Sequence, residues 1–411
     1  MRSHLLATAV MAGLGLAVSS YAQAAQPAAP AVTAAQLREL QAQIAALQSQ
    51  VQQLQAQSEQ QQAQADAQSE VNVTQAQAIE AAQTSASKVD SLAKFVNDTK
   101  VGGRMFFDLS NIDKTSNGQK TSASGTGVDV KRFYLTVDHK FNDIWSANLT
   151  TDFQYSSAIS STELFVKNAY VQGAFDKAFV LKIGAAGMPW IGYVEKFYGY
   201  RYVENTLTDR LKYGNSADWG LHASGDLGTQ FNYAASVVNG AGYKNPTRGK
   251  GMDVEGRVAY QPNANFAVAV GGYSGKLGKE TDVTDADHTY TRGDVMVAYA
   301  SPAFRLGGEY FQAKNLNNVL TVASDKSSGW SLWGSVALGD KGINAFARYD
   351  KTDLSKTLDP TLADKYWNLG VEFPVFKNLK LATVYKYTHQ DNNSSKDDET
   401  KEFGVWGDLS F

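Results

Sequence analysis

The sequence contains no cysteine and only 8 proline residues in 411. The absence of cysteine excludes disulfides and thiolate metal sites, so the fold depends on packing and hydrogen bonds. Acidic and basic residues nearly balance, with a formal net charge of −3, which is not the basic character of a nucleic-acid-binding protein. After the N-terminal region, no run of about 18 apolar residues occurs, so the sequence predicts no transmembrane helix.

Common catalytic motifs are absent as well. The sequence has no GxSxG, no P-loop and no HExxH. The histidines beyond the N-terminal region are scattered, and the acidic run "DADH" at 285–288 falls in a polar stretch that we expect to be a solvated loop. We therefore predict a protein that is not an enzyme, with no catalytic residue, no metal ligand and no cofactor.

Glycine and aromatic residues are plentiful: 35 Gly, 20 Tyr, 19 Phe and 7 Trp. This composition favours many short strands joined by tight turns. At the N-terminus, Arg2 precedes an apolar run at 5–18 and the small-residue pattern "YAQA". Such an arrangement predicts a Sec-type signal peptide at 1–24, cleaved after Ala24, and therefore export from the cytoplasm.

A flexible linker is predicted at 25–36, followed by a Gln/Ala-rich helical segment at 37–100. Its apolar residues recur at a spacing of three and four, which is typical of a coiled-coil seam: Leu37, Leu40, Ile44, Leu47, Val51 and Leu54. We interpret the segment as a periplasmic coiled coil. A partly disordered spacer is the alternative, because the apolar positions beyond residue 58 are sparse.

From residue 101 to residue 411, apolar and polar residues alternate, as in strands with one buried face. The pattern predicts sixteen strands, at 101–112, 127–141, 143–156, 163–175, 178–187, 217–226, 229–240, 250–261, 264–275, 288–301, 303–314, 328–339, 342–351, 365–373, 376–389 and 400–411. Short turns such as "FND" and "SPA" alternate with long polar loops such as 188–216. Outer-membrane barrels sort their connections in this way, with short periplasmic turns and long external loops.

One phase of these strands is free of charge in its central part. It contains Leu149, Leu332 and Leu369, and it ends on Phe411, which we expect to anchor the last strand in the membrane-facing aromatic belt. The fold class predicted is all-β: a 16-stranded antiparallel transmembrane β-barrel, preceded by the short N-terminal helical coiled-coil segment. The strand at 163–175 breaks the rule, because either phase places Lys167 or Asn168 toward lipid; a β-bulge or a shielded subunit interface would explain it.

Four stretches carry a family resemblance: "VKRFYLTVDHKFNDIWSANLTTDFQY", "KNAYVQGAF", "LKIGAAGMPWI" and "WGLHASGD". They resemble the phosphate-selective porin O/P family of Gram-negative outer membranes, over roughly residues 101–411 and most strongly in the first half. The resemblance implies a homotrimer that passes small anions by diffusion. It also implies partners: outer-membrane lipid and lipopolysaccharide, and the barrel assembly machinery through the C-terminal strand. No nucleic acid is expected.

The inward phase predicts the residues that meet the solute. The basic pore-wall candidates are Arg104, Arg132, Lys182, Arg257, Arg292, Arg305, Arg348, Lys380 and Lys386. Acidic residues are as frequent in the same phase, so we expect many of these groups to pair across strands. The resemblance implies that loop 188–216 folds inward as the constriction, with the candidates Glu195, Lys196, Tyr198, Tyr200, Arg201, Glu204, Asp209, Arg210 and Lys212.

The alternating aromatic residues of this loop predict an extended segment, with rings that either anchor the loop or contact solute. The function expected is an outer-membrane porin for small hydrophilic solutes and ions, including phosphate or other anions. The alternatives are a cell-wall tether that uses the helical segment, and an enzyme built on an outer-membrane barrel.

Overall fold

The structure is a computed structural model and describes residues 33–156, 161–392 and 396–411. The predicted signal peptide and most of the predicted linker lie outside these residues. The chain divides into two compact units, Met1–Val89 and Asp90–Phe411.

Helix α1 (Ala34–Asp98) runs for 65 residues, and none of its residues is buried. The prediction of a helix at 37–100 is therefore confirmed, and the helix begins a few residues earlier than expected. The Gln/Ala-rich composition suits a helix, because Gln and Ala both have favourable helix propensities. The apolar seam, from Leu37 to Leu54, is exposed along the single chain. Among the described helices, none is long and apolar enough to cross a membrane.

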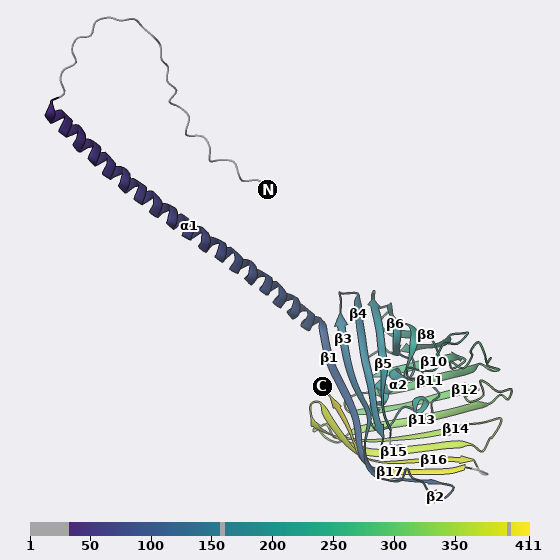
Figure 1. The fold of residues 1–411 in the computed structure, drawn as a ribbon. Coiled ribbons are helices and arrows are strands. Elements are labelled where there is room, and N and C mark those ends of the chain that lie inside the picture. Colours follow the sequence, from purple (N-terminus) through teal and green to yellow (C-terminus); the bar gives the residue numbers. More distant parts are fainter. Residues whose placement is uncertain (1–32, 157–160, 393–395) are drawn as a thin grey trace. The chain divides into compact units, whose positions relative to one another are not determined.

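The second unit is built from β-strands (Figure 1). Their bounds are β1 (Thr99–Ser116), β2 (Gln119–Lys120), β3 (Gly125–Lys140), β4 (Trp145–Ser156), β5 (Ser161–Ala174), β6 (Val180–Gly187), β7 (Ala217–Leu227), β8 (Phe231–Val238), β9 (Asp253–Tyr260), β10 (Phe266–Gly275), β11 (Tyr290–Ala300), β12 (Phe304–Lys314), β13 (Lys326–Ala337), β14 (Asn344–Asp353), β15 (Ala363–Phe376), β16 (Leu379–Asn392) and β17 (Lys396–Ser410). Each predicted strand corresponds to one of these, with ends shifted by a few residues. The two-residue strand β2 was not predicted.

The strands close into an antiparallel barrel. Each pairs with its neighbours in chain order, and β1 completes the ring by pairing with both β17 and β3. The sheet has 17 strands; β2 is a short addition beside β1, which leaves 16 in the ring. Closure pairs the backbone groups that an open sheet edge would leave without partners. The predicted fold class is thus confirmed.

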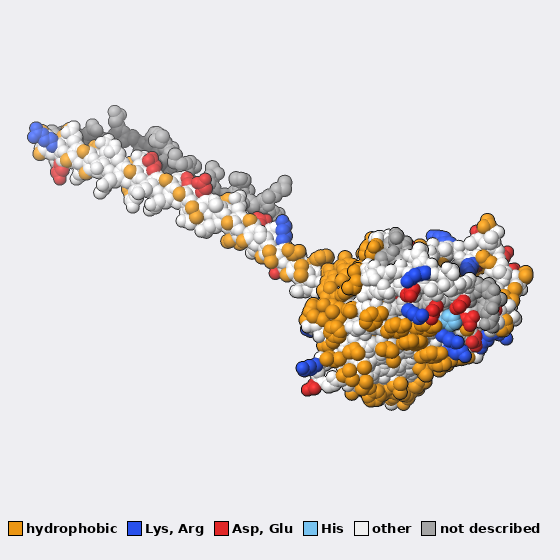
Figure 2. Space-filling view, turned by 90° about the horizontal axis from the view of Figure 1, so that it is seen from below, with side chains coloured by type: hydrophobic (Ala, Val, Ile, Leu, Met, Phe, Trp, Pro, Cys, Tyr) orange, Lys and Arg blue, Asp and Glu red, His pale blue; other side chains and the backbone are white. Residues whose placement is uncertain are grey.

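The two phases of the strands have opposite environments. Leu149, Leu332 and Leu369 are exposed on the outer face, whereas their inward neighbours Thr150 and Asn368 are buried. Figure 2 shows the result as a broad hydrophobic band over the barrel surface, with charged side chains along its edge. Phe411 lies on this outer face beside Phe133, with ring centroids 6.1 Å apart. This pattern fits a lipid environment, in which a charge on the outer face is costly.

Strand β5 contains the bulge that its sequence suggested. In the β4–β5 pair, Thr150 faces Asn168 and Thr151 faces Val166, so Lys167 is the extra residue. The bulge changes the phase and turns both Lys167 and Asn168 away from lipid. A second bulge lies in β3, where Arg132 faces Phe106 but Val130 faces Phe107. It leaves Lys131 unpaired in the ladder, and the sequence did not predict it.

The connections differ in length at the two ends of the barrel. Residues 141–144, 175–179, 228–230, 261–265, 301–303, 338–343 and 377–378 form short turns at one end. The long connections at the other end include 188–216, 239–252, 276–289, 315–325 and 354–362. In outer-membrane barrels the short turns face the periplasm and the long loops face outside, which gives this barrel its orientation.

Candidate channel constriction

The connection 188–216 between β6 and β7 folds into the interior of the barrel, the lumen. Its aromatic residues Trp190, Phe197 and Tyr202 form one buried cluster with inward-facing wall residues, among them Trp333 and Phe346. The loop carries two short helices, α2 (Ile191–Tyr198) and α3 (Leu207–Arg210). The loop therefore narrows the lumen from within.

The expectation of an extended segment in this loop is wrong. Tyr193 and Phe197 belong to α2 and lie one turn apart, with ring centroids 5.4 Å apart. Residues four apart share one face of a helix, so the spacing of Tyr193 and Phe197 was a signal for a helix. The alternation of the other aromatic residues indicated a strand instead. The helix ends at Gly199, whose φ of 83° is left-handed and favours glycine at that position.

The tyrosines of the loop pack against the barrel wall. The ring of Tyr200 stacks on Phe346 with centroids 4.2 Å apart, and Tyr198 lies edge-on to Trp333 at 5.9 Å. Tyr198 and Tyr202 are almost fully buried. Of the two roles considered for these rings, the geometry favours anchoring of the loop over contact with solute.

Charged wall residues hold the backbone of the loop. Glu255 accepts a hydrogen bond from the Trp190 amide at the start of α2 (2.8 Å), and Glu309 accepts one from the Leu207 amide at the start of α3 (2.9 Å). Arg305 donates to the carbonyl oxygen of Phe197 in the last turn of α2, at 3.2 Å. Helix ends leave such groups without partners within the helix, and they favour a negative charge at the start and a positive one at the end.

Two further arginines of the wall bind loop carbonyls in the same way. Arg257 donates to the Pro189 carbonyl at 3.0 Å and lies over the ring of Tyr193. Arg348 donates to the Asn205 carbonyl at 2.5 Å and also pairs with Asp350 on its own strand. These predicted pore-wall residues therefore position the loop.

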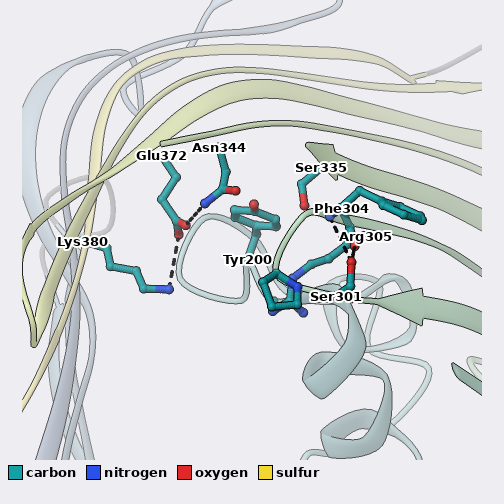
Figure 3. A pocket seen from close by; sticks show the side chains of 10 residues that line it. Tyr200, Ser301, Phe304, Arg305, Ser335, Asn344, Glu372 and Lys380 are labelled. Carbon is teal, nitrogen blue, oxygen red and sulfur yellow. Dashed lines mark hydrogen bonds and ion pairs between the residues drawn. The ribbon is translucent and has the colours of Figure 1, made fainter. Parts of the chain in front are cut away.

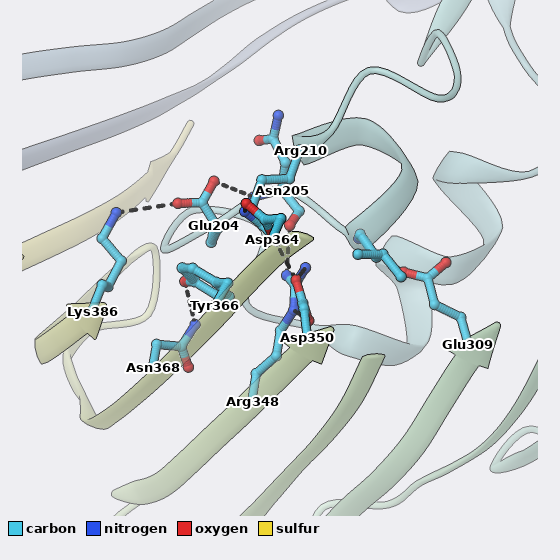
Figure 4. A network of polar contacts seen from close by, with 11 residues as sticks. Glu204, Asn205, Arg210, Glu309, Arg348, Asp350, Asp364, Tyr366, Asn368 and Lys386 are labelled. Atoms are coloured by element: carbon cyan, nitrogen blue, oxygen red, sulfur yellow. Dashed lines mark hydrogen bonds and ion pairs between the residues drawn. The ribbon is translucent and has the colours of Figure 1, made fainter. Parts of the chain in front are cut away.

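The loop charges pair with the wall or with each other (Figure 4). Arg210 contacts Asp350 at 3.2 Å and Asp364 at 2.5 Å, and Glu204 contacts Lys386 at 3.2 Å. Burial alone would raise the pKa of Glu204, but nearby Lys386 and Lys131 outweigh it and hold the pKa below its usual range. The carboxylate of Glu204 therefore stays charged at neutral pH.

The remaining predicted loop residues fall into two groups. Arg201 pairs within the loop, with Glu195 at 2.5 Å and Asp209 at 3.6 Å. Lys196 and Lys212 are exposed instead. The loop charges of the first group are neutralised locally, so they contribute less field to the lumen than the sequence suggested.

A different part of the wall exposes its cations. In the pair Arg104–Asp408 the arginine side chain is 50% exposed and the aspartate 10%. In Lys131–Asp108 the values are 31% and 3%, and in Lys380–Glu372 they are 50% and 7%. The carboxylates are shielded while the cations reach the solvent in the lumen.

Beside these pairs, β1, β3, β4 and β5 line a hollow of about 460 Å³. Its charged residues are Arg104 and Lys167, and its other polar side chains include Tyr134, Asn148 and Asn168. Lys167 lies 4.5 Å from the centre of the Tyr134 ring. The hollow is lined by cations and neutral polar groups, without a carboxylate among its lining residues.

A smaller pocket of about 180 Å³ lies near the short turns (Figure 3). Tyr200, Arg305, Glu372 and Lys380 line it. Glu372 accepts hydrogen bonds from Tyr202 and Asn344 and lies 3.8 Å from Lys380. The carboxylate is thus surrounded by partners, and the two cations at the pocket remain nearer to solvent.

The other predicted wall residues make local contacts. Arg132 lies 3.7 Å from Asp152, Lys182 lies over the Tyr170 ring, and Arg292 pairs with Asp294 and Glu255 at 2.8 and 3.1 Å. The structure adds residues that the sequence reading missed. Lys131 turns inward at its bulge and donates to the Val203 carbonyl of the loop. No local pattern in the sequence marks that bulge.

A second loop, at 239–252, also reaches an inward-facing part of the wall. Tyr243 donates to Asp152 at 2.6 Å, and Lys244 donates to Gln154 at 3.0 Å. In the sequence this loop is marked only by Tyr243 followed by Lys244, and an aromatic residue followed by lysine is too common a pattern to identify a loop that folds inward. In the part of the chain that the structure describes, no cluster of side chains could hold a metal ion.

Comparisons with known proteins agree with this architecture. Residues 99–261 match the model of the family described as "Phosphate-selective porin O and P". No curated protein sequence matches the chain.

Several solved porin structures share the fold. An anion-selective porin from Comamonas acidovorans is 14% identical, with a TM-score of 0.53, and the match covers 76% of this chain and 99% of that one. A loop-deletion mutant of OmpT from Vibrio cholerae is 16% identical, with a TM-score of 0.51 and the same coverage. OmpF of Salmonella typhi, solved with daunomycin, is 13% identical with a TM-score of 0.51, over 76% of this chain and 97% of that one.

At these identities the structural likeness shows the fold, and the family model carries the more specific resemblance. Together they support a channel rather than an enzyme. The chain has the fold of the outer-membrane porins and resembles the phosphate-selective porin O/P family over residues 99–261.

Proposed function

We propose that this protein is an outer-membrane channel for passive diffusion of small hydrophilic solutes and ions, with a weak preference for anions. The observation that carries the preference is the unequal exposure within ion pairs. Arg104, Lys131 and Lys380 are each several times more exposed than the carboxylate that each one pairs with. A passing anion therefore meets the cation first.

The preference is weak because the opposing charges are close. Lys386 reverses the pattern, since it is buried while its partners Glu204 and Glu402 are about 20% and 19% exposed. Water and salt in the lumen also screen each charge over roughly 8 Å at physiological ionic strength. The field biases the flux of ions without forming a tight binding site.

The family description names phosphate, and we propose phosphate as one of the permeating anions. A tight phosphate site would require several cations without carboxylate partners. The hollow beside Arg104 has two cations, one of which already pairs with Asp408. We therefore expect phosphate to reduce chloride current only at millimolar concentrations.

Reversal potentials in a salt gradient across a planar bilayer test the proposal. We expect the double variant Arg104→Gln and Lys380→Gln to shift the reversal potential toward cations, with a smaller change in conductance. The matched control replaces two exposed lysines of the short turns, Lys341 and Lys377, by Gln. An equal shift in both variants, or none in the first, would contradict the proposed role of these cations.

We also propose a homotrimer whose α1 helices associate in the periplasm. A structure of OmpT from Vibrio cholerae with the same fold is described as a trimer form (TM-score 0.50). The exposed heptad seam of α1, from Leu37 to Leu54, is the surface that a coiled coil would bury. The deletion experiment in the Discussion separates this role from that of the channel.

A further inference from the structure

The outer surface of the barrel has a hollow that the channel does not use. It lies at the long-loop end, over β11, β12 and β13, and has a volume of about 490 Å³. Its lining includes three lysines and three neutral polar residues: Lys314, Lys326, Lys356, Thr291, Gln312 and Ser328. Ser328 has a small side chain, and a Cβ added at Gly293 would meet open space, so these positions leave room for a ligand.

Lysine residues on neighbouring strands face each other on this surface. Lys314 lies directly opposite Lys326 across β12 and β13, and Lys351 lies directly opposite Lys365 across β14 and β15. All four are exposed, and among the described residues none of them forms an ion pair. Lys356 lies 3.7 Å from Asp353. Like charges directly opposite each other destabilise a sheet, so this arrangement is unfavourable unless an anion binds there.

The strands continue from the lysines onto an apolar surface. Tyr310 lies opposite Trp330, and the ring of Trp330 is 5.3 Å from that of Tyr349. Beyond them, toward the middle of the strands, Leu332 and Leu369 are exposed. Aromatic residues of this kind mark the level of the membrane interface in outer-membrane barrels.

The spacing along the strands places the lysines just outside that interface. Lys351 is two residues beyond Tyr349, and Lys314 is four beyond Tyr310. At about 3.3 Å per residue, these separations are roughly 7 and 13 Å along the strand. The side chains are therefore at the depth of lipid headgroups, on the side of the long external loops.

The opposite side of the barrel has no comparable cluster. At the long-loop end of β3, β4 and β5, the outward positions hold Val128, Tyr155 and Leu164. Other lysines at this end of the barrel pair with carboxylates, Lys120 with Asp113 and Lys401 with Glu399, both at 3.2 Å, whereas the lysines that face each other lie on β12 to β15. A localised cluster of cations above an apolar surface favours a ligand that has both anionic groups and acyl chains.

We propose that this sector is a binding site for a phosphorylated glycolipid of the outer leaflet. One phosphate occupies the hollow between Lys314, Lys326 and Lys356, with hydroxyl and amide donors from Thr291, Ser328 and Gln312. A second phosphate lies at Lys351 and Lys365. The acyl chains lie along the apolar surface below, over Trp330 and Leu332. Ammonium groups bind phosphate oxygens by charge-assisted hydrogen bonds, and the lipid relieves the repulsion between the facing lysines.

Native mass spectrometry of the full-length protein in detergent, with bisphosphorylated lipid A as the probe, tests this site. The rim variant combines Lys314→Gln, Lys326→Gln, Lys351→Gln and Lys365→Gln. The control variant replaces four lysines at the short-turn end of the barrel by Gln, Lys140 at the end of β3 and Lys177, Lys341 and Lys377 in the turns, and removes the same charge. We expect the rim variant to bind the lipid at least about tenfold more weakly than the wild type, and the control variant to bind it normally.

Three further measurements fix the interpretation. Phosphatase-treated lipid A should bind the wild type no better than intact lipid A binds the rim variant. Equal binding by the rim variant and the wild type, equal losses in both variants, or saturation of the site by inorganic phosphate alone would overturn the proposal. Single-channel conductance of the same rim variant should match the wild type, which shows that it is folded. If the wild-type protein binds lipid A but forms no channel in a planar bilayer, the proposed function is refuted and the proposed lipid site is not.

Discussion

Two parts of the barrel wall use the same residue types for different purposes. On β9 to β14, Arg292 and Arg348 and their carboxylate partners are essentially closed to solvent. On β1 and β16, Arg104 and Lys380 are each 50% exposed beside carboxylates that are 10% and 7% exposed. The first part holds the loop in place, and the second faces the path of the solute. The difference teaches that exposure, rather than charge, decides whether a wall residue acts on the loop or on ions.

The largest effect should come from breaking a buried pair on the loop-holding side. Arg348→Ala removes the closer of the two cations that pair with buried Asp350, so that only Arg210 remains at 3.2 Å, and it removes the hydrogen bond to the Asn205 carbonyl. We expect a loss of about 3–5 kcal/mol in the free energy of unfolding, because removing one partner of a buried ion pair is costly and Arg210 compensates the remaining carboxylate only in part. Urea unfolding of the barrel in lipid vesicles measures it.

The exposed partner provides the control for that experiment. Arg104→Ala should cost less than about 1 kcal/mol, since a pair with a half-exposed member is screened by solvent. Similar losses for Arg348→Ala and Arg104→Ala would mean that the two parts of the wall do not differ as their exposure indicates.

A smaller loss is expected on the lipid-facing surface. Leu149 is exposed on the outer face of β4, so Leu149→Arg would place a charge in the hydrocarbon region and cost about 2–4 kcal/mol. Its neighbour Asn148 faces the lumen and lines the hollow beside Arg104. Asn148→Arg should therefore fold normally and raise the preference for anions. Folding yield in vesicles measures the first effect, and equal yields for both variants would contradict the assignment of phases.

The smallest effect on the channel should follow removal of residues 25–97. The deletion ends before β1, which begins at Thr99 and closes the barrel by pairing with β3 and β17, so conductance of the deletion variant should equal that of the full chain. We expect the oligomer of the variant to dissociate at a lower temperature, because the α1 seam is lost. Preserved conductance with a defect in envelope integrity would favour the tether function, whereas loss of conductance would contradict the division into two roles.

The sequence predicted much of the barrel and less of the candidate site. Strand positions, the outward phase of Leu149 and Leu369 and the inward phase of Arg292 follow from a local alternation of two residues, which the hydrophobic effect imposes on any half-buried strand. The bulge at Lys167 was one of two explanations considered, because a charged residue appeared in both phases. The bulge at Lys131 left no such trace in the sequence.

Apart from the bulges at Lys131 and Lys167, the sequence by itself determined which residues face lipid and which face the lumen, because that choice depends on alternation along each strand. Tertiary structure alone decided what the lumen residues do. The helix in loop 188–216, the hydrogen bond from Arg348 to the Asn205 carbonyl and the exposure of Arg104 depend on register and on contacts between residues far apart in the chain. The effect of a charge depends on its neighbours and on its exposure to solvent, and both depend on the closed barrel and the folded loop.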